Sequence, residues 1–66
     1  MTLKDKEVGY KTYCEIQELQ IKAQELVSKA RKEKDIEAKY DAQNRISAYV
    51  RVKSILIKNF GLTFEQ

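Results

Sequence analysis

The fold of this chain depends on residues 30–38, which read ARKEKDIEA. Before this stretch, small and apolar residues recur every seven positions, with Ile16, Ala23 and Ala30 at one position of the repeat, as in helices that pack lengthwise on a partner. Continuing the same frame places Glu37 and two further polar residues at that position. The repeat therefore does not continue through residues 30–38, and we expect a turn within them.

Both sides of this turn favour helix, because proline is absent and Glu, Lys, Gln, Ala and Leu fill the middle of the chain. Asp35 is a favourable N-cap for the second helix, although the turn region 33–35 lacks a glycine. We expect an all-α fold in one domain, with helices over about 3–33 and about 36–60 folded back as an antiparallel hairpin. The competing interpretation is one continuous helix as far as Phe60, with a stutter in its coiled coil.

The seven-residue repeat also defines an apolar seam on each expected helix. On the first helix, the second position of the repeat holds Thr12, Leu19 and Leu26. On the second helix, the two seam positions hold Ala42, Ile46, Tyr49, Lys53, Leu56 and Phe60, with Val50 and Ile57 widening the seam. We expect the two seams to face each other, with alanines allowing the helix axes to approach closely.

The ends of the helices also carry signals. Thr2 and Asp5 are spaced like a capping box and predict the start of the first helix. Gly9 is expected to loosen the first turns, because glycine costs a helix about 1 kcal/mol relative to alanine. Gly61 predicts a Schellman ending for the second helix, followed by a short tail over 61–66 whose phenylalanine is a candidate to pack back.

A chain of 66 residues builds only a small core. Its single cysteine cannot form an internal disulfide, and histidine is absent, so neither a disulfide nor a zinc site is available to stabilise it. Self-association is the remaining means of covering apolar surface, and we expect a homodimeric four-helix bundle or a higher oligomer. The candidate interface residues are apolar residues off the seams, namely Cys14, Ile21, Val52 and Ile55.

Charge is distributed unevenly along this chain, whose net charge is +3. Residues 42–64 contain four basic residues and no acidic residue, whereas acidic and basic residues are mixed over the first helix. In an antiparallel hairpin the basic segment lies beside the start of the first helix, which carries two tyrosines. The candidate residues for binding a ligand or partner at this end are Tyr10, Lys11, Tyr13, Arg51, Lys53 and Lys58.

Lys53 is unusual because it occupies a seam position in the middle of the second helix. A polar residue at such a position sets the register and oligomeric state of a bundle while its ammonium group reaches toward solvent. This interpretation predicts that Lys53→Leu raises thermal stability. The alternative is that Lys53 faces a cavity that holds an anion.

The chain lacks the residues that catalysis usually requires. It has no histidine, no glycine-rich phosphate loop and no base to activate the thiol of Cys14. Asp35, Glu37 and Asp41 form an acidic group with two interpretations, binding of Mg²⁺ or complementing the positive end of the second helix. The helix explanation is the simpler one, so we expect no metal, no cofactor and no enzymatic activity.

The longest apolar runs are three residues, such as Ile55-Leu56-Ile57, far short of the roughly 18 needed to span a bilayer. Residues 1–7 mix charges and contain no apolar segment of a secretory signal. A helix lying on a membrane surface is disfavoured, because the first helix has nearly as many acidic as basic residues. We therefore expect a soluble, cytoplasmic protein.

These features indicate two candidate functions. The first is a small non-enzymatic regulator or adaptor, like many phage and plasmid accessory factors, that self-associates and binds another protein through a helical face. The alternative is binding of RNA, DNA or a nucleotide at the basic, tyrosine-bearing end, with a tyrosine ring stacked on a base. Alanine and leucine layers in a hairpin of this length are similar to those of the plasmid Rop family, whose members dimerise and bind paired RNA. No motif beyond this architecture matches.

Overall fold

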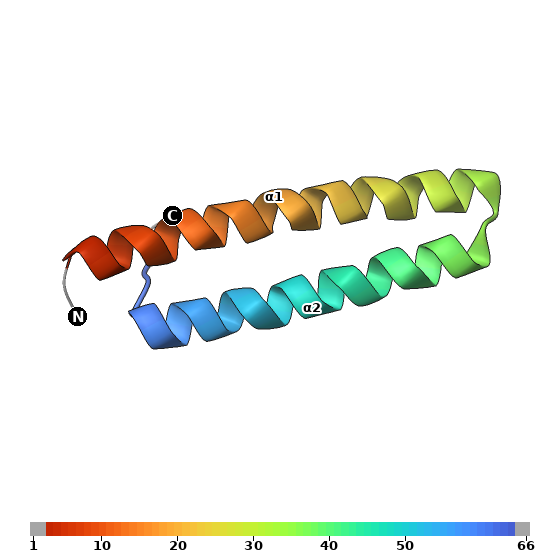
Figure 1. Ribbon diagram of the computed structural model, residues 1–66. Helices are drawn as coiled ribbons and strands as arrows, with labels where there is room; N and C mark the ends of the chain where they lie inside the picture. The colour runs from red at the N-terminus through yellow and green to blue at the C-terminus, as the bar shows by residue number, and fades with distance from the viewer. Residues whose placement is uncertain (1–2, 65–66) are drawn as a thin grey trace.

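The computed structural model describes residues 3–64 as two antiparallel α-helices joined by a tight turn (Figure 1). Helix α1 spans Leu3–Glu33 and helix α2 spans Ile36–Phe60. The hairpin expected from the sequence is confirmed, and the alternative of one continuous helix is wrong. Thr2, the expected cap of α1, lies outside the described residues, as do the last two residues of the tail.

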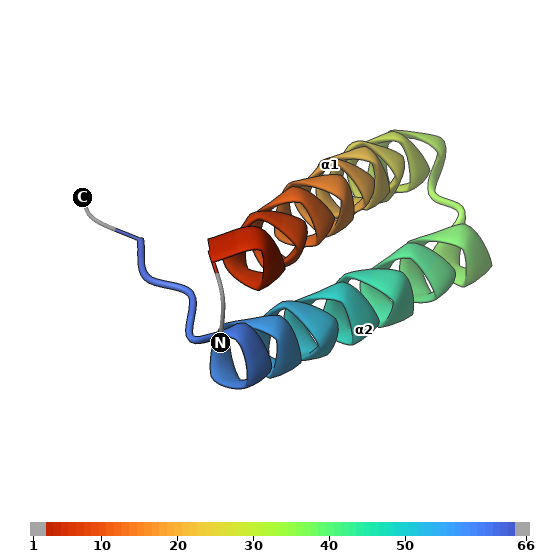
Figure 2. The ribbon, with the colours of Figure 1, turned by 60° about the vertical axis from the view of Figure 1, so that its left-hand side comes forward.

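The two helices lie side by side over most of their length, as Figures 1 and 2 show from two directions. The molecule is elongated and measures 47 × 19 × 17 Å. The C-terminal segment leaves α2 and returns toward the first turns of α1. Among the described residues, neither helix combines the length and apolarity needed to cross a membrane.

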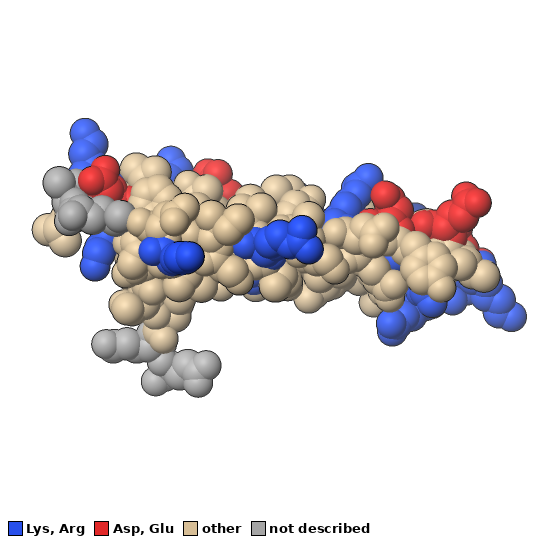
Figure 3. Space-filling view, turned by 90° about the horizontal axis from the view of Figure 1, so that it is seen from below, with Lys and Arg blue, Asp and Glu red and all other residues tan. Residues whose placement is uncertain are grey.

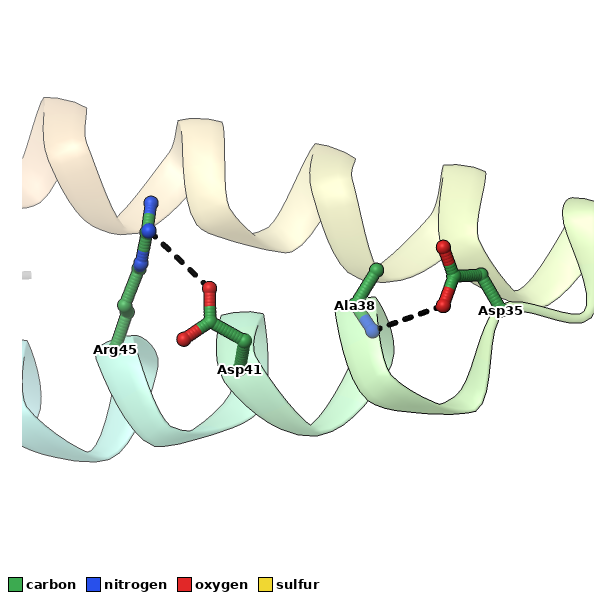
Figure 4. A network of polar contacts seen from close by, with 4 residues as sticks. All are labelled: Asp35, Ala38, Asp41 and Arg45. Carbon is green, nitrogen blue, oxygen red and sulfur yellow. Dashed lines mark hydrogen bonds and ion pairs between the residues drawn. The ribbon is translucent and has the colours of Figure 1, made fainter.

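The turn between the helices is a Schellman ending built on a lysine. Lys34 has a φ of 57°, in the left-handed region that favours glycine, and its N–H donates to the Arg31 carbonyl at 3.3 Å. The N–H of Asp35 donates to the Ala30 carbonyl at 2.9 Å. A carboxylate oxygen of Asp35 accepts the N–H of Ala38 at 3.1 Å and caps α2, as predicted (Figure 4). Asp35 thus takes part in ending one helix and beginning the next.

Helix α2 ends at the predicted glycine. Gly61 has a φ of 61° and donates its N–H to the Ile57 carbonyl, and the N–H of Leu62 donates to the same oxygen at 3.2 Å. Leu62 is only 4% exposed, because its side chain lies against Gly9 of α1. The Schellman motif therefore turns the chain back onto α1.

The contact between the helices runs along the predicted seam of α2. The residues at its two seam positions are buried or half-buried, namely Ala42, Ile46, Tyr49, Lys53, Leu56 and Phe60. On α1, one of the two predicted seam positions also faces the partner helix, since Ala23 and Ala30 are buried and Ile16 is half-buried. These parts of the sequence prediction are confirmed. Val50 and Ile57, which were expected to widen the seam, are instead 46% and 38% exposed.

At the other predicted seam position of α1, the prediction is wrong for Leu19 and Leu26, which do not face α2. Leu19 is 43% exposed and Leu26 is 47% exposed. The residues that accompany the alanines against α2 lie one position later in the repeat, and they are Tyr13, Gln20 and Val27. A seven-residue repeat has a flank on each side, and periodicity alone does not say which flank meets the helix of the same chain. The two leucines therefore form a ridge on the surface, called here the leucine ridge.

Candidate functional site

The end of the hairpin opposite the turn is closed by the C-terminal segment. The Tyr10 hydroxyl donates to the Thr63 carbonyl at 2.9 Å and accepts the Thr63 N–H at 3.0 Å. The ring of Phe64 meets Tyr10 edge to face at 5.7 Å between centroids and lies 4.5 Å from the ring of Tyr13. The phenylalanine of the tail thus packs back on α1, and these contacts fasten the tail across two aromatic residues one turn apart.

A notch at Gly9 makes this closure possible. A Cβ at position 9 would lie 2.8 Å from Cγ of Phe60 and 2.9 Å from its Cβ, which is closer than carbon atoms approach. Gly9 is buried, and α1 runs through it without a break. Sequence reasoning assigned this glycine only a destabilising effect and missed its packing role, because nothing local to residue 9 indicates that Phe60 lies opposite.

The two tyrosines proposed to stack on bases already have partners within the chain. The ring of Tyr13 has Phe64 on it and the Lys53 Nζ at 5.3 Å from its centroid, so a base would compete with both for this ring. The pKa of Tyr10 lies below its usual value because its hydroxyl is hydrogen-bonded to Thr63, with a smaller contribution from the ammonium group of Lys6. Stacking at this end therefore requires rearrangement of the tail.

Lys53 belongs to a polar layer that crosses the middle of the hairpin. Its ammonium group donates to Oε1 of Gln17 and faces the ring of Tyr13. Gln20 lies one turn further along α1, and its Oε1 is buried without a hydrogen-bond partner. Lys53 is half-buried and its nitrogen has partners on α1, an arrangement that suits a residue that sets the register of the two helices.

The basic candidates do not form one surface. Helical residues two positions apart point in nearly opposite directions. Lys11 is two positions from both Gly9 and Tyr13, which face α2, so Lys11 lies on the outer side of α1. Arg51 and Lys58 are each two positions from seam residues of α2, so they lie on the outer side of that helix, and all three basic residues are exposed. The single basic, tyrosine-bearing surface expected from the sequence is therefore divided between two sides of the hairpin.

The outer surface of α2, defined here by Arg51, Ile55 and Lys58, is the strongest candidate for binding. Ile55 is 51% exposed and lies one turn from each of the two basic residues. Figure 3, viewed from the α2 side, shows basic groups on a largely uncharged surface with acidic groups at its margins. Residues 42–64 contain no acid, so neither cation meets a carboxylate from its own half of α2.

The four interface candidates fall on two sides of the molecule. Cys14 and Ile21 are seven positions apart and share one line along α1, whereas Leu19 points in nearly the opposite direction from Ile21. Val52 and Ile55 are exposed on α2. A single flat interface that includes the leucine ridge cannot also contain Cys14 and Ile21. Sequence reasoning missed the leucines because it assigned them to the seam within the chain.

Two of the three acidic residues singled out near the turn, Asp35 and Asp41, make local contacts. Asp35 caps α2, and the carboxylate of Asp41 pairs with the guanidinium of Arg45 at 3.1 Å, one turn along the same helix (Figure 4). Within residues 3–64, no group of three or more metal-ligating side chains is close enough together to hold a metal ion. The capping interpretation of Asp35 is confirmed.

The groups on the outer surface of α2 are suited to binding. A guanidinium presents a fork of N–H donors to a carboxylate or phosphate, an ammonium group adds a second positive charge, and the alkyl side chain between them offers apolar area. No known protein family, curated protein or solved structure matches this chain.

Proposed function

We propose that this protein is a small non-enzymatic adaptor or regulator, acting in the cytoplasm, that self-associates and binds another protein through the outer surface of α2. The observation that carries the proposal is the acid-free half of α2, on which Arg51 and Lys58 flank the exposed Ile55. The complementary partner is an amphipathic helix with carboxylates two turns apart and an apolar residue between them.

The spacing on α2 defines what the partner must present. Seven helical residues span about 10 Å along the axis, so Arg51 and Lys58 meet carboxylates that are also about two turns apart. Exposed ion pairs contribute little to affinity, which comes mainly from burying Ile55 and the alkyl stems of the two flanking basic residues. The two cations instead select an acidic partner and speed its association.

The experiment that tests this proposal compares two double charge reversals. Arg51→Glu with Lys58→Glu changes the outer surface of α2, while Lys4→Glu with Lys11→Glu makes the same change in net charge, at the same spacing, on α1. The wild type and both variants are used to capture partners from nuclease-treated lysate of the source cells, and the recovered protein is purified and titrated by calorimetry. We expect the α2 variant to lose binding and the α1 variant to keep it. Equal binding by the two variants would contradict the assignment of this surface.

Nucleic-acid binding is the second candidate, supported by the same acid-free run over residues 42–64, which exposes Arg51 and Lys58. If it is correct, affinity for RNA or DNA falls steeply with salt, because each phosphate contact releases counterions. Titrations with single-stranded RNA, duplex RNA and duplex DNA at low salt check it. Two results together would identify the partner as a nucleic acid. The α2 double reversal would abolish binding to RNA or DNA, and the material captured from lysate would be lost when the lysate is treated with nuclease.

A further inference from the structure

The hairpin exposes more surface than a compact protein of its size. Its accessible surface is 5475 Å², whereas a compact folded protein of 7.7 kDa exposes about 4,300 Å². The difference is about 1,200 Å², which exceeds the roughly 800 Å² that each partner buries in an interface of standard size. The buried apolar residues are few and mostly small, namely Ala23, Val27, Ala30, Ala42 and Leu62. The core of one hairpin is therefore small, and its exposed surface is large enough for a dimer interface.

A groove between the two helices lies at the turn end of the molecule. Its volume is about 300 Å³, and it is lined by Leu26, Lys29, Ala30, Glu33, Ala38, Asp41, Ala42 and Arg45. Ala30 and Ala42 are buried and form the floor, because their methyl groups leave the space between the helices unfilled. Leu26 stands at the rim and is 47% exposed. The groove is thus an apolar hollow between charged walls.

The same face continues from the groove along both helices. Residues seven positions apart lie on one line of a helix, so Leu26 leads to Leu19 on α1, and Arg45 leads to Val52 on α2. Leu19 is 43% exposed and Val52 is 38% exposed. This groove face, defined by Leu19, Leu26, Val52 and the alanine-floored groove, presents aliphatic side chains in its middle and a hollow at one end.

The charges around the groove are balanced in sign. Lys29 and Glu33 line the α1 side, and Asp41 and Arg45 line the α2 side. Each wall therefore carries one cation and one anion. A surface of this kind does not repel a rotated copy of itself, whereas a partner of one charge sign would meet as many like charges as opposite ones.

We propose that a second copy of this chain docks on the groove face, so that two hairpins form a four-helix bundle with the leucine ridge inside. The inference rests on the self-association in the proposed function and names the surface that performs it. Isologous packing requires a self-complementary patch, and here aliphatic side chains and an alanine-floored hollow lie on one face with walls of mixed charge. The bundle removes Leu19, Leu26 and Val52 from water.

Two lysine substitutions of equal chemistry test the proposal. Leu19→Lys places a charge on the groove face, and Ile21→Lys places the same charge on the opposite side of α1, where the replaced residue is 44% exposed against 43% for Leu19. Sedimentation equilibrium gives the dimer dissociation constant of each variant, and circular dichroism measures its helix content. We expect Leu19→Lys to raise the constant by about 30-fold or more, as a central interface residue does. Ile21→Lys should change it by less than about threefold.

A crosslinking measurement covers the case in which Leu19→Lys fails to fold. In a Cys14→Ser background, a benzophenone is attached through Leu26→Cys or, as the control, through Ile21→Cys. Irradiation should give covalent dimers from the label at position 26 and not from the label at position 21.

Two results would overturn the inference, and they have different consequences. If the wild-type protein remains a folded monomer up to millimolar concentration, both the proposed self-association and the proposed interface on the groove face are wrong. If the wild type is a dimer that Leu19→Lys leaves intact, or that crosslinks through position 21 and not position 26, only the assignment of the interface to the groove face is wrong. The self-association then stands, with its interface on the other side of the hairpin.

Discussion

Gly9 of α1 and Phe60 of α2 touch so closely that a methyl group at position 9 would lie 2.8 Å from the Cγ of the phenylalanine. The Cβ of Phe60, which the backbone of α2 holds in place, would lie 2.9 Å from the same methyl group, so a change of side-chain rotamer does not relieve the contact. The two helices therefore approach closely at this end because residue 9 has no side chain.

Gly9→Ala should destabilise the hairpin, although alanine favours helix by about 1 kcal/mol. The added methyl group forces the helices apart at the Phe60 contact, and overpacking of this kind costs about 1–3 kcal/mol. Urea denaturation followed by circular dichroism measures the free energy of unfolding. Combining Gly9→Ala with Phe60→Gly removes both atoms that the added methyl group would meet, so the double variant should recover the helix-propensity gain and be more stable than Phe60→Gly alone. A Gly9→Ala protein more stable than the wild type would contradict the packing role.

Lys34→Gly should raise the free energy of unfolding by about 1 kcal/mol, because a residue with a side chain is strained in the left-handed conformation that Lys34 adopts. The opposite change at the other Schellman ending, Gly61→Ala, should lower it by about 1 kcal/mol, since Gly61 has nearly the same φ and open space around its Cα. Thermal and urea unfolding of the pair check both signs. If both changes move stability in the same direction, the backbone conformation at one of the turns is not as described.

Tyr10→Phe should release the tail while leaving the helices intact. The substitution removes the hydroxyl that both donates to and accepts from the backbone of Thr63. Heteronuclear NOE values at Thr63 and Phe64 should fall, while those in the middle of α2 stay unchanged. Tyr40→Phe is the control, because Tyr40 is 58% exposed and lies on α2 far from the tail. Equal loss of order in both variants would rule out the hydrogen bonds as the cause.

Lys53 and Gln17 should behave as a coupled pair in a double-mutant cycle. Lys53→Leu alone leaves Oε1 of Gln17 without its donor, so the stabilisation expected from a more apolar seam is offset. Lys53→Leu together with Gln17→Leu replaces both partners and should raise the free energy of unfolding by about 1–2 kcal/mol. Additive effects of the two single changes would show that the contact contributes nothing.

The sequence by itself determined the two helices, the turn between them and both ends of α2. These features depend on residues close together in the chain. Asp35 caps α2 through the N–H of Ala38, three positions away, and Gly61 ends α2 through a carbonyl four positions before it. Backbone hydrogen bonds of this range are set by local conformational preference, so capping residues and a break in the seven-residue repeat are sufficient to place them.

Only the tertiary structure decided which flank of α1 meets α2, that Gly9 lies against Phe60, and where the tail lies. Each depends on residues far apart in the sequence, such as Tyr10 and Thr63, which are 53 positions apart, or Gln17 and Lys53, which are 36 apart. Periodicity gives the direction of one residue relative to others on the same helix, but the rotation of one helix against another is set by the packing of both. That rotation exposed Leu19 and Leu26, separated Lys11 from Arg51 and Lys58, and so divided between several faces the residues that the sequence had suggested as one site.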